Sequence, residues 1–228
     1  MLFNSLKFLL FFPVVTLMYF ALPHRFRWLW LLAMSCVFYM AFVPYYILIL
    51  GFTIVIDYFA GILLESAPPQ RKKLYLIMSI VANVGVLAVF KYYNFLIENF
   101  NSLFHFSGND FSFPLLHIIL PIGLSFHTFQ AMSYTIEVYR GNQKAEKHFG
   151  IYALYVMFFP QLVAGPIERA KHLLPQFNNA RNFNYSLASS GAKLILFGYF
   201  KKVVIADKIA PFVNGVYNSP HDYPGFPM

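Results

Sequence analysis

The chain of 228 residues has few charged residues: Asp, Glu, Lys and Arg make up 11% of it, whereas hydrophobic residues make up 59%. A soluble domain carries about 25% charged residues, so this chain cannot cover itself with a charged surface. The shortage of charge therefore excludes an ordinary soluble domain. It indicates an integral membrane protein that crosses the bilayer several times.

Cysteine is almost absent as well, since Cys36 is the one cysteine in the sequence. A single cysteine cannot form a disulfide within the chain, and no Cys and His spacing is typical of a zinc site. We therefore expect no bound metal and no bound cofactor. The net charge is +8, but the basic residues fall in short loops between apolar runs. This pattern is typical of cytoplasmic loops and argues against nucleic acid as a partner.

Long apolar runs account for most of the chain and predict an all-α fold. A helix needs about 20 apolar residues to cross a bilayer core of about 30 Å. On this basis we expect about seven membrane segments, some of them broken or re-entrant. They are residues 2–21, 28–42, 45–64, 74–95, 124–139, 149–164 and 187–206. A broken or kinked helix is expected around Pro121 and Gly123, where the short run 115–120 ends.

The stretch 158–177 begins as apolar as a membrane segment and then becomes polar within a few residues. Two prolines remove backbone donors, and three polar or charged side chains would be costly in hydrocarbon. These residues are Pro160, Gln161, Pro166, Glu168 and Arg169. Broken backbone at membrane depth is tolerated only where protein or water surrounds it. We therefore expect the chain to turn inside a protein-lined space and the loop 164–186 to re-enter.

Four polar residues share one face of the helix predicted at 124–139. His127, Gln130 and Tyr134 lie at positions i, i+3 and i+7, and Glu137 continues the face at i+10. Such a stripe either lines a wet cavity or forms a hydrogen-bonded packing seam between helices. The residues alone leave both interpretations open.

Two further sets of charged residues have alternative interpretations. Asp57 lies within an apolar run, and we favour a hydrogen bond that fixes helix packing over a functional role, because nothing else in its segment accompanies it. Arg169 either pairs with Glu168 or binds an anionic group, since its planar fork of donors suits phosphate or carboxylate. No Ser/His/Asp set or phosphate loop is visible, so these residues do not name a reaction.

Four sequence blocks carry a resemblance to a known family. They are FPQLVAGPIER at 159–169 with LPQ at 174–176, LPIGLSF at 120–126 with TFQ and YRG after it, FKYYNF at 90–95, and KKVVIAD at 201–207. In this order they resemble the membrane-bound O-acyltransferase family. The resemblance is stronger to its bacterial branch, which includes the alginate O-acetylation membrane protein and the D-alanyl transfer protein of teichoic acid synthesis. His127 departs from the family pattern, which usually has Phe or Tyr there.

The resemblance implies an enzyme of the bacterial cytoplasmic (inner) membrane, built as a ring of helices around a funnel. It would move an acyl group, usually acetyl, from a cytoplasmic donor such as acetyl-CoA or an acyl carrier. The acceptor would be a hydroxyl on an extracytoplasmic polysaccharide, of the alginate type, or on a partner protein. The remaining partner is membrane lipid.

The resemblance also implies that residues 1–228 are the N-terminal part of the acyltransferase domain. The family's essential histidine lies in a His-Gly block that we expect beyond Met228, so no catalytic residue is assigned here and this part alone is expected to be inactive. The candidates for a substrate or donor channel are His127, Gln130, Tyr134, Glu137, Gln161, Glu168 and Arg169.

A non-enzymatic membrane transporter or assembly subunit is the alternative function. Transporters also use broken helices with buried polar side chains. An internal repeat would favour this alternative, and none is visible between the two halves of the sequence.

The distribution of basic residues predicts that loops 65–73 and 140–148 face the cytoplasm. A Lys72→Cys variant in a Cys36→Ser background should therefore resist a membrane-impermeant thiol reagent in intact cells and react after permeabilisation. Labelling in intact cells would contradict this orientation.

Overall fold

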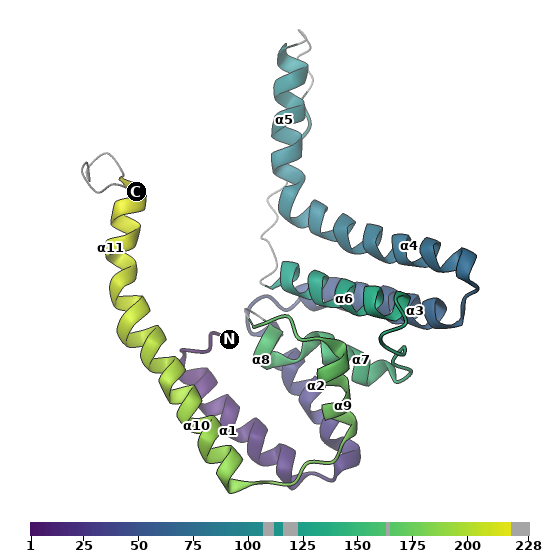
Figure 1. The fold of residues 1–228 in the computed structure, drawn as a ribbon. Helices are drawn as coiled ribbons and strands as arrows, with labels where there is room; N and C mark the ends of the chain where they lie inside the picture. The colour runs from purple at the N-terminus through teal and green to yellow at the C-terminus, as the bar shows by residue number, and fades with distance from the viewer. Residues whose placement is uncertain (107–111, 116–122, 163–164, 220–228) are drawn as a thin grey trace. The chain divides into compact units, whose positions relative to one another are not determined.

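The computed structural model describes residues 1–106, 112–115, 123–162 and 165–219, and every regular element within them is a helix (Figure 1). The chain divides into two compact units. The first contains residues 17–180 together with Met1, and the second contains residues 2–16 and the chain from Arg181 onward. The predicted all-α class is confirmed for the described residues.

The core of the first unit is formed by three helices that pack on one another: α3 (Tyr46–Ser66), α4 (Pro69–Leu87) and α6 (Leu124–Tyr139). A second group consists of three helices, in which α2 (His24–Met40) packs against α7 (Phe149–Met157) and α8 (Phe159–Leu162). The short α9 (Ala170–Asn178) packs on α7. Nearly all of α7 is buried, so α7 lies at the centre of this second group.

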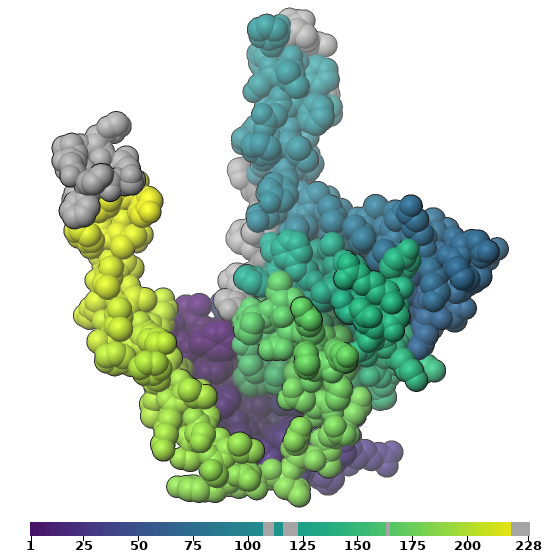
Figure 2. Space-filling view, in the orientation of Figure 1, coloured from purple at the N-terminus to yellow at the C-terminus, as the bar shows by residue number. Residues whose placement is uncertain are grey.

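The fourth apolar run forms a longer helix than the sequence predicts. It begins at Pro69, continues through the π-helix η1 (Ala88–Tyr92) and ends with α5 (Tyr93–Phe106). The expected end near residue 95 is wrong, because the polar side chains beyond it bond to their own helix. Asn99 Nδ2 donates to the Phe95 carbonyl at 2.6 Å and Ser102 Oγ to the Glu98 carbonyl at 2.8 Å. No residue of α5 is buried, and Figure 2 shows its side chains exposed on the viewed face.

The start of α6 is set by Gly123, which has a positive φ of 80°. A side chain is strained in this left-handed region, so glycine is suited to the turn that enters the helix. The predicted bounds of this helix, residues 124–139, are confirmed. The break expected before this helix involves Pro121 and residues 116–120, and these residues lie outside the described ones.

The run 149–164 is not one helix, because α7 ends at Met157. Phe158 leaves the helical conformation, with a ψ of 114°, and Pro160 has no N–H to continue the ladder. The Phe159 N–H, which the break separates from α7, donates to Ser35 Oγ of α2 at 3.1 Å. Residues 163 and 164 of the predicted segment lie outside the described residues.

The second unit combines the start of α1 (Leu6–Ala21) with a long helix near the C-terminus. That helix consists of α10 (Tyr185–Tyr199), the π-helix η2 (Phe200–Ala206) and α11 (Asp207–Asn218). Its predicted end at residue 206 is wrong. Lys202 pairs with Asp207 at 2.6 Å across the end of η2, so the charged residues stabilise a continuing helix rather than ending it.

Two described helices are long and apolar enough to cross a membrane: Tyr46–Ser66 and the continuous helix Pro69–Phe106. The helix Leu6–Ala21 is also apolar but shorter. These lengths fit a membrane-associated protein.

Candidate functional site

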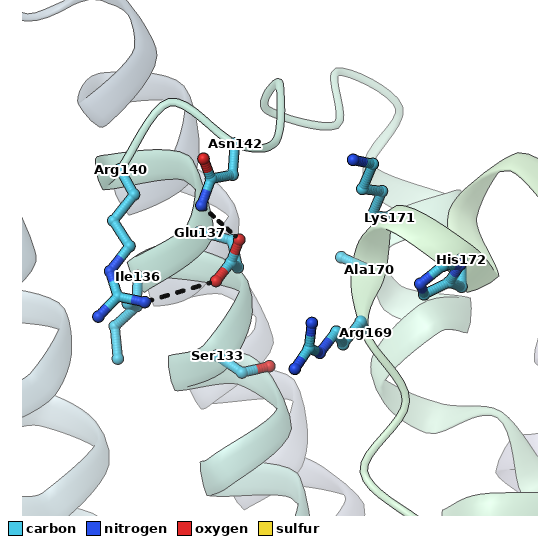
Figure 3. A pocket seen from close by; sticks show the side chains of 9 residues that line it. All are labelled: Ser133, Ile136, Glu137, Arg140, Asn142, Arg169, Ala170, Lys171 and His172. Atoms are coloured by element: carbon cyan, nitrogen blue, oxygen red, sulfur yellow. Dashed lines mark hydrogen bonds and ion pairs between the residues drawn. The ribbon is translucent and has the colours of Figure 1, made fainter.

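A cavity of about 690 Å³ lies between the C-terminal part of α6 and the start of α9 (Figure 3). The α6 side and the turn after it contribute one wall, and the first residues of α9 with the preceding Arg169 contribute the other. Its lining residues are Ser133, Ile136, Glu137, Arg140, Asn142, Arg169, Ala170, Lys171 and His172.

The charge of this cavity is predominantly positive. Among the described residues that line it, Glu137 is the one acidic residue, and its carboxylate is engaged by Arg140 at 3.8 Å and by Asn142 Nδ2 at 3.0 Å. Arg169 and Lys171 form no ion pair with any described residue. The cavity therefore presents two cations whose charges no described side chain neutralises.

Arg169 is held at the cavity by its backbone. It is the N-cap residue of α9, with extended dihedral angles of −72° and 134°. The hydroxyl of Tyr155 donates to the neighbouring Glu168 carbonyl at 3.0 Å, which ties this turn to α7. Figure 3 shows the Arg169 guanidinium pointing across the cavity toward Ser133. Its side chain is not paired with Glu168, so the interpretation as a local ion pair is not supported.

The residues that line the cavity show that two segments distant in sequence, the end of α6 and the start of α9, lie close together. Arg140 follows α6 directly and Arg169 precedes α9, yet both line the same space. Between them, α7 has 9 residues, and a helix of that length spans about 14 Å. The chain thus leaves the end of α6 and comes back to the same cavity.

Two of the predicted site residues donate hydrogen bonds to a backbone carbonyl near the C-terminal end of α7. Gln130 of α6 and Gln161 of α8 both donate to the Tyr155 carbonyl, at 2.7 Å and 3.0 Å. The last four carbonyls of a helix have no partner in the next turn, and Tyr155 is within that distance of Met157, where α7 ends. Both glutamines are buried and act as a hydrogen-bonded seam between three helices.

The other predicted side chains of the α6 stripe are buried away from the cavity. Tyr134 accepts from the Glu146 N–H at 2.8 Å, and its ring packs on Gly61 of α3. His127 is 3% exposed, its Nε2 has no hydrogen-bond partner among the described residues, and its ring lies 6.1 Å from that of Tyr39. Of the seven predicted residues, Glu137 and Arg169 line the cavity; the other five do not.

Five polar residues of the cavity were not among the sequence candidates: Ser133, Arg140, Asn142, Lys171 and His172. The signal that could have found Ser133 and Arg140 is helical spacing, since they lie four residues before and three residues after Glu137. Lys171 and His172 carry no such signal, because nothing in the sequence places the start of α9 beside α6.

The chain is similar to several bacterial O-acetylation proteins. It is 35% identical to the peptidoglycan O-acetyltransferase of Helicobacter pylori, over 94% of this chain and 46% of the relative. It is 38% identical to the probable alginate O-acetylase AlgI of Pseudomonas aeruginosa and 36% identical to that of Azotobacter vinelandii. These matches cover 94% of this chain and 41% and 43% of the relatives. The chain thus spans less than half the length of these relatives.

These similarities agree with the resemblance of the sequence blocks to the membrane-bound O-acyltransferase family. The relatives are proteins named for O-acetylation of alginate and of peptidoglycan. No family model matches the chain, and no solved structure matches it.

The two glutamines on the Tyr155 carbonyl should show coupled effects on stability. Gln130→Met and Gln161→Met should each cost about 1 kcal/mol of unfolding free energy, because the other glutamine still satisfies the carbonyl. The double variant should cost about 1–3 kcal/mol more than the sum, since it leaves a buried carbonyl unpaired. Chemical unfolding of the full-length protein in detergent measures these differences.

Gln176→Met is a matched control, because Gln176 is exposed on α9 and its loss should change stability by less than about 0.5 kcal/mol. Additive effects of the two buried substitutions, within about 0.5 kcal/mol, would contradict the shared carbonyl.

Proposed function

We propose that the chain forms part of a membrane O-acyltransferase, which moves an acetyl group from a cytoplasmic donor to hydroxyls of an exported or cell-surface polysaccharide. The observation that carries this proposal is the similarity to named O-acetyltransferases over 94% of the chain. The relatives include proteins named for alginate and for peptidoglycan. An alginate-type polysaccharide is the acceptor we favour, and an extracytoplasmic acceptor protein is the second possibility.

The donor is proposed to bind with its phosphate groups at the cavity between α6 and α9. Acetyl-CoA and the phosphopantetheine arm of an acyl carrier both carry phosphate next to a thioester. Arg169 and Lys171 offer unpaired positive charge there. The N-terminal end of α9 adds a partial positive charge of its own. Arg169 supplies a planar fork of donors that matches two phosphate oxygens at once.

The end of the first unit that holds this cavity is proposed to face the cytoplasm. Arg140 and Asn142 of the basic loop 140–148 line the cavity. The same loop approaches a second basic loop, because Trp28, which follows residues 23–27, packs on His148 with ring centroids 4.7 Å apart. Tyr58 of α3 donates to the Lys147 carbonyl at 2.6 Å. Cytoplasmic loops are enriched in Lys and Arg, so a donor from the cytoplasm would meet the cavity directly.

The chemistry of transfer is proposed to use a histidine of the family's His-Gly block, which residues 1–228 do not contain. As a general base it would take the proton of the acceptor hydroxyl while that oxygen attacks the acyl carbon and the thiol leaves. The part of the protein described here would then bind the donor and form a wall of the helical funnel. About seven segments and a multi-pass location in the bacterial inner membrane belong to the same proposal.

A membrane transporter or assembly subunit is not favoured as an alternative, because the similar proteins are named for acetyl transfer. The acetyl content of the surface polysaccharide in a deletion strain separates the two functions. Loss of acetylation supports the transferase, and unchanged acetylation with altered solute uptake supports the transporter.

Arg169→Lys in the full-length enzyme tests the role of the guanidinium fork. We expect acetylation to fall by about tenfold or more, since losing a bidentate charged contact costs about 1.5–3 kcal/mol, while the protein still accumulates in the membrane. The acetyl content of the polysaccharide and the level of the protein are measured together.

Arg71→Lys serves as the control, because Arg71 is exposed in the first turn of α4 and does not line the cavity. It should leave acetylation unchanged. Normal acetylation with lysine at position 169 would remove Arg169 from the proposed donor site.

A further inference from the structure

A buried acid forms a polar cluster in the core of the first unit, away from the cation-lined cavity. Asp57 of α3 accepts from Ser79 Oγ of α4 at 2.6 Å and from Asn83 Nδ2 at 2.8 Å and 2.9 Å, one distance to each carboxylate oxygen. Ser79 also lies 3.4 Å from Thr135 Oγ1 of α6. All four side chains are 0% exposed. The three core helices therefore meet at one carboxyl group.

This carboxyl group is paired with no cationic side chain in the part of the chain that the structure describes. No described Lys, Arg or His forms an ion pair with Asp57, and the charged residues of α2 and α4 are confined to the first turns of those helices. The titratable groups near it are neutral phenols: Tyr152 of α7 is within electrostatic range, and Tyr134 of α6 packs on Tyr152 at 4.7 Å. An ionised carboxylate buried without a cation carries a large desolvation cost.

The amide of Asn83 can serve both protonation states of the acid. In the structure its Nδ2 donates to both oxygens of Asp57, which suits a carboxylate. Its Oδ1 is buried and has no partner among the described residues. Turning the amide by half a revolution would direct Oδ1 at Asp57, where it could accept from a carboxylic O–H. Ser79 can donate to the other carboxyl oxygen in either state.

We propose that Asp57 is a proton-binding site within the membrane-embedded core, and that Asn83 is the amide that reorients when the proton binds. The carboxylate takes up one proton from water to become a neutral acid, and its new O–H donates to Asn83 Oδ1. Ionisable groups inside membrane proteins frequently hold protons in this way. The site does not depend on the proposed acyl transfer, because none of its residues lines the donor cavity.

Infrared spectroscopy of the full-length protein in lipid nanodiscs tests this site. The wild-type protein at neutral pH should show the C=O stretch of a protonated carboxylic acid, which shifts on exchange into D₂O. Asp57→Asn keeps the size of the side chain and should lose this band. The matched control Glu137→Gln should keep it, because Glu137 is partly exposed and paired with Arg140.

Asn83→Leu provides a second measurement that does not depend on the folding of Asp57→Asn. It should move the acid C=O band to a different frequency, because the O–H loses its acceptor. Two results would overturn the proposal: identical spectra of the wild type and Asp57→Asn in the carboxylic acid region at every pH at which the protein stays folded, or an unshifted band in Asn83→Leu.

Discussion

The break in helical structure between Met157 and Arg169 is the constraint on which the rest of the first unit depends. A helix that stops in an apolar environment leaves donors and acceptors that water cannot satisfy. The protein satisfies them with side chains from three other helices: Ser35 of α2 accepts from the Phe159 N–H, and Gln130 with Gln161 donates to the Tyr155 carbonyl. The seam of polar residues is thus a consequence of the broken helix.

The same interruption produces the candidate site. The chain leaves the helical conformation after Met157 and begins α9 beside the residues that end α6. This return joins Arg140 and Glu137 to Arg169 and Lys171, which are distant in sequence. A cavity with unneutralised positive charge arises from local breaks rather than from a dedicated binding motif.

The sequence predicted the elements whose signals are local. The helix 124–139 was predicted with its correct ends, because Gly123 and the apolar pattern mark them. Helix ends that lie beyond the apolar run were missed, as at Phe106 and Asn218, because polar residues continue both helices past it. Contacts between helices were not predictable either: Asp57 was assigned a packing hydrogen bond, but its partners Ser79 and Asn83 lie on the next helix. For the same reason, the stripe on α6 could not be divided into seam and cavity residues from its spacing alone.

The distance between the end of α6 and the start of α9 tests the returning chain most directly. Spin labels at Asn142→Cys and Lys171→Cys, in a Cys36→Ser background of the full-length protein in bilayers, report this distance by pulsed electron resonance. Since both positions line one cavity, the distribution should centre well below the ~30 Å thickness of the bilayer core. A distribution centred at or above ~30 Å would show that the segment crosses the membrane instead, and would contradict the account.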